Sequence, residues 1–374
     1  MLNGITVVPG LKSDLEADDL NDLTQTTGEQ AAAPEEKILS RYICTANHGF
    51  APYAQEELRR LFGAVKSTLL LPGEIFLATL EGEPEEVSRV LSANLPIFLR
   101  HIQPVQFQDQ GDLSALDRLA VYLSRRSELE GEKVSLHVRK GAASFWQDSP
   151  GELREWLQER LQSLEADFTV QDPAWVISVY ADGDALYAGV SRPEDNLSSW
   201  NGGMIRFRKE DGQISRAKFK LMEAEKEFAI PFSNFRNAVD IGASPGGWTS
   251  FLLERGLKVT AVDPALMHES LRNLPGLKIL RKNAGEVKFR DNEFDLLVCD
   301  MSWSPKLMAK LVTGLLHSLS PGGTAVVTVK LMHKKPLAVI KEIIAMFEGE
   351  RMQVQRAKQL FHNRDEITLY MIKY

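Results

Sequence analysis

The sequence predicts an open α/β fold with a parallel sheet in its C-terminal half and two smaller α+β units before it. Strand and helix patterns alternate from about residue 201 to the end of the chain. The first five of these strands are continuous apolar runs, as expected for strands buried on both faces of a parallel sheet. A glycine-rich loop follows the first strand directly, which is where open α/β sheets bind a ligand.

Length and composition exclude several classes of protein. The 374 residues exceed one average domain, and the apolar fraction of 44% and charged fraction of 25% are those of soluble globular proteins. No apolar run approaches the roughly 20 residues of a membrane span, and residues 1–10 lack the order of a secretory signal, so we expect a cytoplasmic protein. Cys44 and Cys299 lie in apolar runs and are expected to be reduced core thiols. No metal site is expected, because no histidine falls at metal-ligand spacing with a cysteine.

Charge is divided unevenly along a chain whose net charge is −7. Residues 1–36 hold one lysine against eight acidic residues, which predicts a disordered tail. Residues 37–200 carry −8, whereas residues 201–374 carry +8. A basic C-terminal half suits a polyanionic partner such as RNA, with a chance asymmetry as the alternative interpretation.

Residues 37–107 predict a two-layer α+β unit. A strand begins at Ile38, and Pro52 opens an amphipathic helix that runs to about Phe62. Two further strand patterns flank the Pro-Gly pair at 72–73, and a second helix starts near Glu85. The predicted order is therefore strand, helix, strand, strand, helix.

A second unit is expected at residues 108–195. Residues 134–138 alternate as a strand does. Ser149, Pro150 and Glu152 supply the N-cap, the first-turn proline and the capping-box acid of a helix. Residues 175–181 and 186–191 predict a hairpin across the Asp-Gly-Asp turn at 182–184.

The third unit, residues 196–374, carries the strand–helix alternation. Its predicted strands are 238–242, 258–263, 277–281, 294–300, 324–331, 354–359 and 367–372. Helices are predicted at 246–255, after Ser304-Pro305 and from Pro336. Little helix is expected between the third and fourth strands, because residues 283–292 form a short, polar segment.

The loop at 242–248, Gly-Ala-Ser-Pro-Gly-Gly-Trp, is the predicted cofactor site. Gly242, Gly246 and Gly247 lack the Cβ atom that would keep backbone amides away from a close ligand. Asp263 ends the next strand, where a carboxylate accepts the hydroxyls of a cofactor ribose. The dinucleotide pattern Gly-x-Gly-x-x-Gly is absent, so the loop fits S-adenosylmethionine better. A dinucleotide site and a purely structural turn are the alternatives.

Four polar residues accompany this loop: Lys220, Asp300, Lys330 and Glu366. Two lysines interleaved with two carboxylates favour proton transfer. A hydroxyl is a poor nucleophile until its proton is removed or shared, and a free lysine is mostly protonated at neutral pH until its surroundings change that. Each residue also has a structural interpretation, such as a turn cap for Asp300 or a surface ion pair for Glu366.

Several motifs resemble the FtsJ/RrmJ family of ribose 2′-O-methyltransferases. They are Ser-Arg-Ala-x-x-Lys-Leu at 215–221, Asp-Ile-Gly-Ala-Ser-Pro-Gly-Gly-Trp-Thr at 240–249, Val-Cys-Asp-Met at 298–301, Val-Lys-Leu at 329–331 and Arg-Asp-Glu-Ile at 364–367. Segments at 196–200, 331–335 and 359–366 are similar to a narrower family, the bacterial large-subunit rRNA cytidine 2′-O-methyltransferases. Over residues 38–192 the resemblance lies only in the order of elements.

The resemblance implies a Rossmann-like S-adenosylmethionine-dependent methyltransferase domain at 196–374, preceded by a ferredoxin-like domain at 37–107 and a THUMP-like RNA-binding domain at 108–195. It also implies a catalytic tetrad of Lys220, Asp300, Lys330 and Glu366. The implied cofactor contacts are Gly242, Ser244, Pro245, Gly246, Gly247, Trp248, Asp263, Asn283 and Asp300. The narrower family has cysteine in place of Ser244 and an acid in place of Asn283, whose amide oxygen would have to accept the adenine amino group here.

The implied reaction is methyl transfer from S-adenosylmethionine to a ribose 2′-hydroxyl, in a cytidine of 23S rRNA or of a large-subunit precursor, with no metal and no membrane. In our hypothesis Lys330 is the base, Asp300 and Glu366 position it, and Lys220 tunes charge and steers the ribose. The alternatives are an inactive RNA-binding paralogue, a tRNA substrate, or a small-molecule O-methyltransferase, which would need neither the basic half nor two further domains. The oligomeric state does not follow from the sequence.

Basic residues mark the expected RNA contacts. Near the cofactor loop these are Arg206, Arg208, Lys209, Arg216, Lys218 and Lys220, with Phe207 and Phe219 interleaved, and Lys334 and Lys335 after the hypothesised base. In the first two units the candidates are Arg125, Arg126, Arg139 and Lys140. A solvated linker face is the alternative for residues 206–209.

Overall fold

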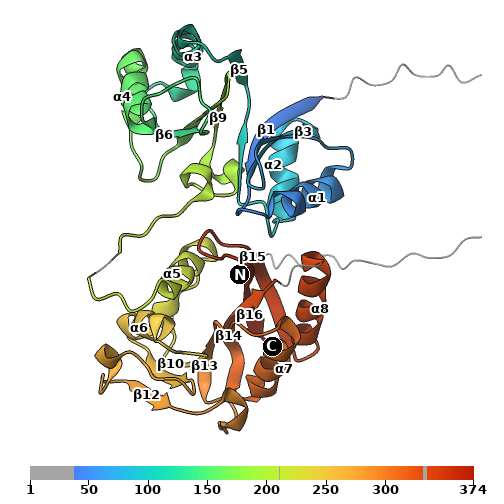
Figure 1. Cartoon of the computed structure of the whole chain (residues 1–374), viewed down its shortest axis with the longest axis vertical. Helices are drawn as coiled ribbons and strands as arrows, with labels where there is room; N and C mark the ends of the chain where they lie inside the picture. The colour runs from blue at the N-terminus through green and yellow to red at the C-terminus, as the bar shows by residue number, and fades with distance from the viewer. Residues whose placement is uncertain (1–37, 210, 332–334) are drawn as a thin grey trace, which may run out of the picture.

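The computed structural model describes residues 38–209, 211–331 and 335–374. Three β-sheets follow one another along the chain, and Figure 1 shows the first two beside each other above the third. The predicted tail at 1–36 and the predicted RNA contact Lys334 lie outside the described residues. Within the described ranges, no helix combines the length and apolar character that crossing a membrane demands.

The first sheet has four antiparallel strands in the order β2-β3-β1-β4. Its strands are β1 (Leu39–Thr45), β2 (Lys66–Leu71), β3 (Ile75–Glu81) and β4 (His101–Pro104), and its helices are α1 (Ala51–Phe62) and α2 (Pro84–Ala93). Five of these elements match the prediction. β4 was not predicted, because a four-residue strand containing His and Gln has no apolar pattern and is defined only by its pairing with β1.

The second sheet has the order β5-β9-β8-β6-β7. Its strands are β5 (Phe107–Gln110), β6 (Lys133–Lys140), β7 (Asp167–Phe168), β8 (Trp175–Asp182) and β9 (Ala185–Ser191), and its helices are α3 (Leu113–Ser124) and α4 (Pro150–Arg160). The predicted β8–β9 hairpin is confirmed. The capping box of α4 is also confirmed, since the Glu152 amide donates to Ser149 Oγ at 3.2 Å and the Ser149 amide donates to the Glu152 carboxylate at 2.6 Å.

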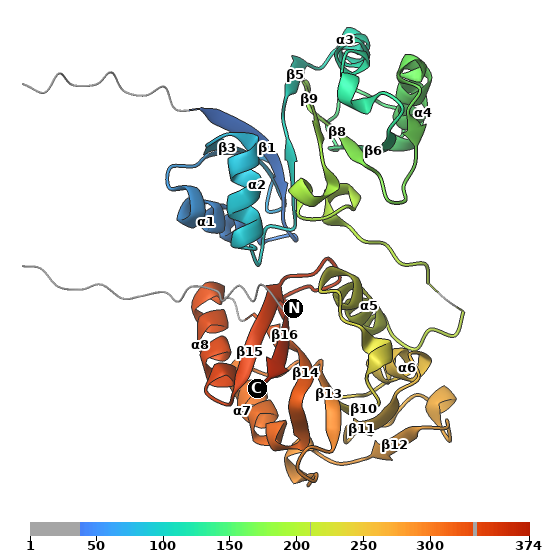
Figure 2. The same ribbon diagram turned by 180° about the vertical axis from the view of Figure 1, so that it is seen from behind.

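The third sheet has seven strands in the order β12-β11-β10-β13-β14-β16-β15, which lie side by side in Figure 2. They are β10 (Asn237–Ile241), β11 (Lys258–Val262), β12 (Leu277–Leu280), β13 (Phe294–Cys299), β14 (Leu319–Lys330), β15 (Met352–Lys358) and β16 (Glu366–Lys373). β10 to β14 are parallel, whereas β16 runs antiparallel to both of its neighbours. β14 begins five residues before the predicted 324, because Leu319 pairs with Phe294 of β13.

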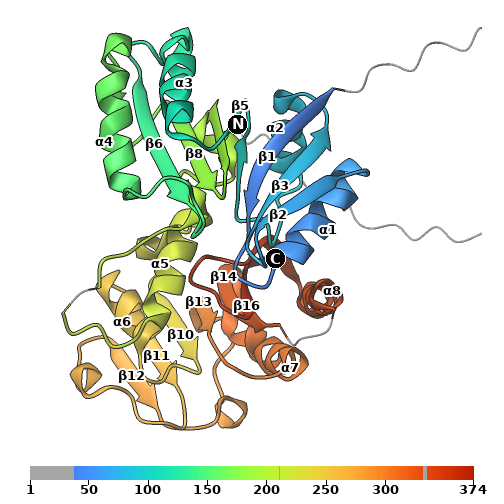
Figure 3. The same ribbon diagram turned by 45° about the horizontal axis from the view of Figure 1, so that its top comes forward.

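Two pairs of helices cover the two faces of this sheet. α5 (Ala217–Glu227) and α6 (Gly247–Glu254) lie on one face, and α7 (Pro305–Leu315) and α8 (Pro336–Glu348) lie on the other (Figure 3). Successive strand residues divide between the two cores: Ala238 packs with α5 and α6, whereas Val239 packs with α7 and α8. Burial on both faces explains why these strands are continuous apolar runs.

Both cysteines are free and buried, as predicted for core thiols. Cys44 lies in β1 and Cys299 ends β13. Burial raises the pKa of both thiols well above its usual range, so each stays protonated at neutral pH.

Replacing Ser149 with alanine should destabilise α4 by about 1 kcal/mol, because the mutation leaves the Glu152 amide without its N-cap acceptor. Hydrogen exchange of the α4 amides, read together with thermal unfolding, measures the effect. Ser163→Ala, at an exposed serine of the same unit, is the control and should change neither. Equal protection of α4 in wild type and Ser149→Ala would show that the cap contributes nothing.

Candidate active site

The four predicted polar residues meet at one end of the third sheet. Asp300 directly follows β13, Lys330 ends β14 and Glu366 begins β16. Side chains an even number of positions apart on a strand share a face. On the faces that carry these three residues, Val298 and Val326 belong to the core on the α5–α6 side, and Tyr370 packs against it. Asp300, Lys330 and Glu366 therefore project toward α5, which carries Lys220.

Lys220 lies between the two carboxylates. Its Nζ atom is 3.0 and 3.1 Å from the two Asp300 oxygens and 2.6 Å from Glu366 Oε1. The side chains of Lys220, Asp300 and Glu366 are 17%, 17% and 14% exposed, so the ion pairs are mostly shielded from solvent. Thr328 Oγ1 also donates to Asp300 Oδ1, at 2.7 Å.

The charge state of Lys220 follows from these contacts. Burial by itself would lower the pKa of the ammonium, but the charges and hydrogen bonds of Asp300 and Glu366 outweigh burial and raise that pKa. Lys220 therefore stays protonated throughout the neutral range. Its stabilising contribution is complete below the ordinary lysine pKa of ~10.4 and is lost as pH rises through the folded-state value.

Lys330 has a different environment. It faces Glu366 directly in the register of β14 and β16, so the two side chains leave the sheet on the same side. Within the described part of the chain, however, its ammonium has no hydrogen-bond or ion-pair partner. Our hypothesis that Asp300 and Glu366 position Lys330 is therefore wrong. Both carboxylates hold Lys220 instead, because α5 places that lysine between them.

The glycine loop connects β10 to α6 at the same end of the sheet. Gly242 has φ 77° and Gly246 has φ 115°, a region that favours glycine. A Cβ atom on Gly242 would lie 2.4 Å from Met301 Cγ, and one on Gly246 would lie 2.1 Å from Leu271 Cδ1. Glycine is thus required at both positions by the backbone conformation and by the close approach of neighbouring loops.

Asp263 organises this loop from the end of β11. Its carboxylate accepts hydrogen bonds from the amides of Ser244 at 3.1 Å and Ala265 at 2.8 Å. Ser244 Oγ donates to the carbonyl of Leu266 at 3.0 Å. Each Asp263 oxygen keeps a lone pair beyond these bonds, so the carboxylate can still accept a ligand hydroxyl.

Two of the predicted cofactor contacts differ in exposure. Trp248 is 3% exposed, and its indole donates to the carbonyl of Ala217 at 2.8 Å, so the ring packs in the core and joins α6 to α5. Asn283 is exposed at the end of β12, and its amide nitrogen donates to Glu286 Oε1 at 3.0 Å. That bond orients the Asn283 amide through its nitrogen and does not involve the amide oxygen, which is the atom expected to accept the adenine amino group.

The sequence-based prediction missed Asp240. This residue is 1% exposed beneath the glycine loop, and its carboxylate accepts a hydrogen bond from Thr249 Oγ1 at 2.6 Å. Burial raises the pKa of Asp240 to about 7, with the charges of Asp300 and Asp263 adding to the shift. A carboxylate inside the apolar run Ala-Val-Asp-Ile is the sequence signal that could have identified it.

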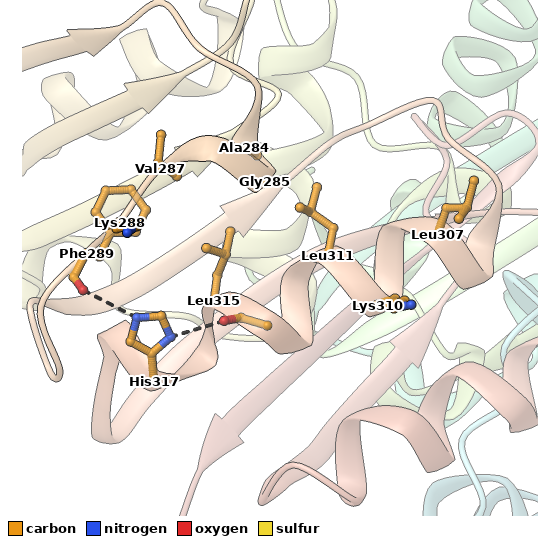
Figure 4. A pocket seen from close by; sticks show the side chains of 11 residues that line it. Ala284, Gly285, Val287, Lys288, Phe289, Leu307, Lys310, Leu311, Leu315 and His317 are labelled. Carbon is orange, nitrogen blue, oxygen red and sulfur yellow. Dashed lines mark hydrogen bonds between the residues drawn. The ribbon is translucent and has the colours of Figure 1, made fainter.

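A groove of about 620 Å³ lies on the other face of the sheet, between α7 and residues 284–289 (Figure 4). Leu307, Leu311 and Leu315 line it from the helix. The chain between β12 and β13 forms only a short 3-10 turn, Ala284–Glu286, as the polar segment there predicted, so this side of α7 is left open. The four polar residues are on the α5 side, and the groove is separate from them.

The structure corrects two of the predicted RNA contacts, Lys218 and Arg139. Lys218 is buried and its Nζ is 2.9 Å from the Glu254 carboxylate. Arg139 is buried and donates to Thr45 Oγ1 and Gln103 Oε1, both at 2.8 Å. From these buried positions, neither the Lys218 ammonium nor the Arg139 guanidinium can contact a phosphate of RNA. The exposed candidates are Arg125, Arg206, Arg208, Lys209, Arg216 and Lys335.

Comparison with known proteins supports the methyltransferase fold of the third unit. The family described as FtsJ-like methyltransferase matches residues 213–350. Proteins named ribosomal RNA large subunit methyltransferase M are similar over more of the chain. The one from Tolumonas auensis is 30% identical over 310 residues, which cover 78% of this chain and 83% of the relative. The one from Alkalilimnicola ehrlichii is 30% identical over 325 residues, covering 79% and 83%.

Other similarities are shorter or structural. The corresponding protein of Halorhodospira halophila is 34% identical over 198 residues, so the match spans 51% of this chain and just over half, 56%, of the relative. Among solved structures, TrmN from Thermus thermophilus is 16% identical with a TM-score of 0.38 and covers 90% of this chain and 100% of that one.

The parallel sheet, the glycine loop and the matched region together define an FtsJ-like methyltransferase domain. Sequence similarity continues beyond this domain into the first two units. The chain belongs to the ribosomal RNA large subunit methyltransferase M family, which confirms the resemblance found in the sequence motifs.

Replacing Lys220 with methionine should lower the free energy of unfolding at pH 8 by on the order of 2 kcal/mol, because Asp300 and Glu366 lose the cation between them. Chemical unfolding at pH 8, where Lys220 is protonated, measures the effect.

The matched control is Lys330→Met, which removes a lysine from the same site without breaking an ion pair with any described residue. It should change the free energy of unfolding by less than about 0.5 kcal/mol. Equal destabilisation by the two variants would contradict the assignment of the carboxylates to Lys220.

Proposed function

We propose that this protein transfers a methyl group from S-adenosylmethionine to the 2′-hydroxyl of a cytidine ribose in 23S rRNA. The observation that carries the proposal is the juxtaposition of Lys220, held between Asp300 and Glu366, with Lys330 at the cofactor edge of the sheet. Membership of the ribosomal RNA large subunit methyltransferase M family supports an RNA substrate.

We also infer the identity of the three units. The order strand, helix, strand, strand, helix, strand of the first sheet supports a ferredoxin-like domain at 37–107. The second sheet supports a THUMP-like RNA-binding domain at 108–195, and the third a Rossmann-like methyltransferase domain at 196–374. The exposed Arg125 and Arg216 are basic residues from which phosphate contacts would come in the second and third domains.

The residues at the cofactor edge fit S-adenosylmethionine. Gly242, Gly246 and Gly247 leave the loop backbone without side chains, and the parallel order β12-β11-β10-β13 brings the ends of four strands together. Asp263 would accept the ribose hydroxyls, the amide oxygen of Asn283 would accept the adenine amino group, and Asp300 would flank the amino-acid moiety. Bound there, S-adenosylmethionine supplies an activated methyl group.

In this mechanism the two lysines have separate tasks. Lys220 stays protonated between its carboxylates, so it supplies a fixed positive charge and orients the ribose. Lys330 has no carboxylate partner among the described residues, and its ε-nitrogen, when neutral, takes the proton from the 2′-hydroxyl. Asp300 and Glu366 act on the substrate through Lys220.

A labelled-methyl assay tests the function. The protein, labelled S-adenosylmethionine and large-subunit rRNA from cells lacking the protein should give labelled RNA, whereas small-subunit rRNA and tRNA should not. A ribose 2′-O-methyl group protects the adjacent phosphodiester from alkaline hydrolysis, so one gap in an alkaline ladder should appear at a cytidine. Label on tRNA alone would support the tRNA alternative, and binding of both ligands without transfer would support an inactive paralogue.

Replacing Lys330 with methionine should lower kcat by roughly 10²- to 10⁴-fold, because the hydroxyl proton loses its acceptor. The dissociation constant for S-adenosylmethionine, measured by titration calorimetry, should stay within about threefold of wild type. Lys335→Met, at an exposed lysine nearby, is the control and should affect RNA binding at most. Undiminished turnover by Lys330→Met would remove this residue from the mechanism.

A further inference from the structure

The loop between β15 and β16, residues 359–365, leads directly into Glu366. It lies at the end of the third unit that faces the first unit (Figures 1 and 3). The carbonyl of Asp365 accepts a hydrogen bond from the Leu331 amide at 2.5 Å, one residue beyond Lys330. The conformation of this loop therefore sets where Glu366 stands relative to both lysines.

One side of the loop is held by α5. The buried Glu223 carboxylate accepts hydrogen bonds from the amides of Phe361 at 2.7 Å and His362 at 2.9 Å. Glu223 lies three residues after Lys220 on the same helix, so the two side chains are neighbours on one face. The helix that supplies the ammonium thus also holds the loop that supplies its carboxylate partner.

The other side of the loop is held by the first unit. Asn47, which follows β1, donates from its amide nitrogen to the carbonyls of Leu360 at 2.8 Å and Asn363 at 2.9 Å. The amide of Gln359 donates to the carbonyl of Ile97 at 2.8 Å. Asn47 is 7% exposed, so these bonds are shielded from water.

Asn47 is itself fixed by Arg100. Arg100 donates from one guanidinium nitrogen to Asn47 Oδ1 and from Nε to the Gly202 carbonyl at 3.1 Å, and its guanidinium carbon lies 5.2 Å from the centre of the Phe361 ring. Both donors and the acceptor of the Asn47 amide are therefore engaged. A side chain with every polar atom bonded in this way defines one position for the loop.

The segment that contains Ile97 is also fixed. The Glu57 carboxylate of α1 accepts hydrogen bonds from the amides of Ile97 at 2.8 Å, Phe98 at 2.9 Å and Leu99 at 3.2 Å. Residues 97–99 therefore cannot shift without breaking bonds to α1. The first unit presents a rigid surface to the loop, not a flexible contact.

We propose that Asn47 is a positioning residue for the methyl-transfer site: it holds loop 359–365 from the first unit and so places Glu366 against Lys220. The first unit then contributes to the chemical step, in addition to any contact with RNA. This inference rests on the proposed function, because it assigns Glu366 to the reacting site.

The test compares Asn47→Leu with Asn47→Asp, which keeps the size of the side chain and the acceptor for Arg100 but removes both donors. The control is His48→Ala, at the exposed neighbouring position. With rRNA and S-adenosylmethionine, both Asn47 variants should lower kcat at least tenfold and leave KM for RNA and Kd for S-adenosylmethionine within about threefold. A small displacement of a catalytic group has effects of this size. A raised KM with unchanged kcat would overturn the proposal and make Asn47 part of RNA binding.

A double-mutant cycle separates positioning from general destabilisation. If Asn47 acts through Glu366, then Asn47→Asp should lower kcat by no more than about twofold in a Glu366→Gln background. A full tenfold or greater loss in that background would show that Asn47 acts independently of Glu366 and would overturn the proposal.

Hydrogen exchange provides a readout independent of methyl transfer. In both Asn47 variants the amides of residues 359–363 should exchange at least tenfold faster than in wild type, and those of α6 should be unchanged. If wild type transfers no methyl group to rRNA, the proposed function fails. Hydrogen exchange then still tests whether Asn47 holds loop 359–365. Unchanged exchange of the loop in correctly folded variants would overturn the inference by itself.

Discussion

The contact of Lys220 with both Asp300 and Glu366 is the interaction on which the site depends. It joins α5, the end of β13 and the beginning of β16, which are far apart in the sequence. Two mostly buried carboxylates this close would repel each other without a cation between them. The same contact holds Lys220 in its charged form. The two lysines of the site therefore differ, because Lys220 is a fixed positive charge whereas Lys330 has no carboxylate partner among the described residues.

The direction of β16 explains how the first unit reaches this contact. Because β16 runs antiparallel to β14, its first residue, Glu366, lies beside the last residue of β14. The loop before β16 must therefore pass over the cofactor edge of the sheet. There it is enclosed by Glu223 on one side and Asn47 on the other. A parallel strand in this place would have carried the loop to the opposite end of the domain.

Elements with a strong local signal were predicted well, and elements defined by their neighbours were not. Pro-initiated helices, the capping box at Ser149 and the apolar strands of the third sheet follow from local pattern. β4 exists because it pairs with β1, and its sequence has no pattern of its own. Lys218 and Arg139 resemble surface cations in the sequence, yet Lys218 is buried against Glu254 and Arg139 among Thr45 and Gln103. Burial of a charged side chain depends on what packs over it.

The sequence by itself determined the α/β class, the glycine loop and the four polar residues of the site, because strand alternation, backbone freedom at glycine and residue chemistry are local properties. Only the tertiary structure decided which lysine the carboxylates hold, since that depends on α5 lying across the strand ends. It likewise decided that Asn47, more than 300 residues before the loop it bonds, belongs with the site. A hydrogen bond between segments so distant leaves no periodicity in the chain, because each partner has only to meet the other in space.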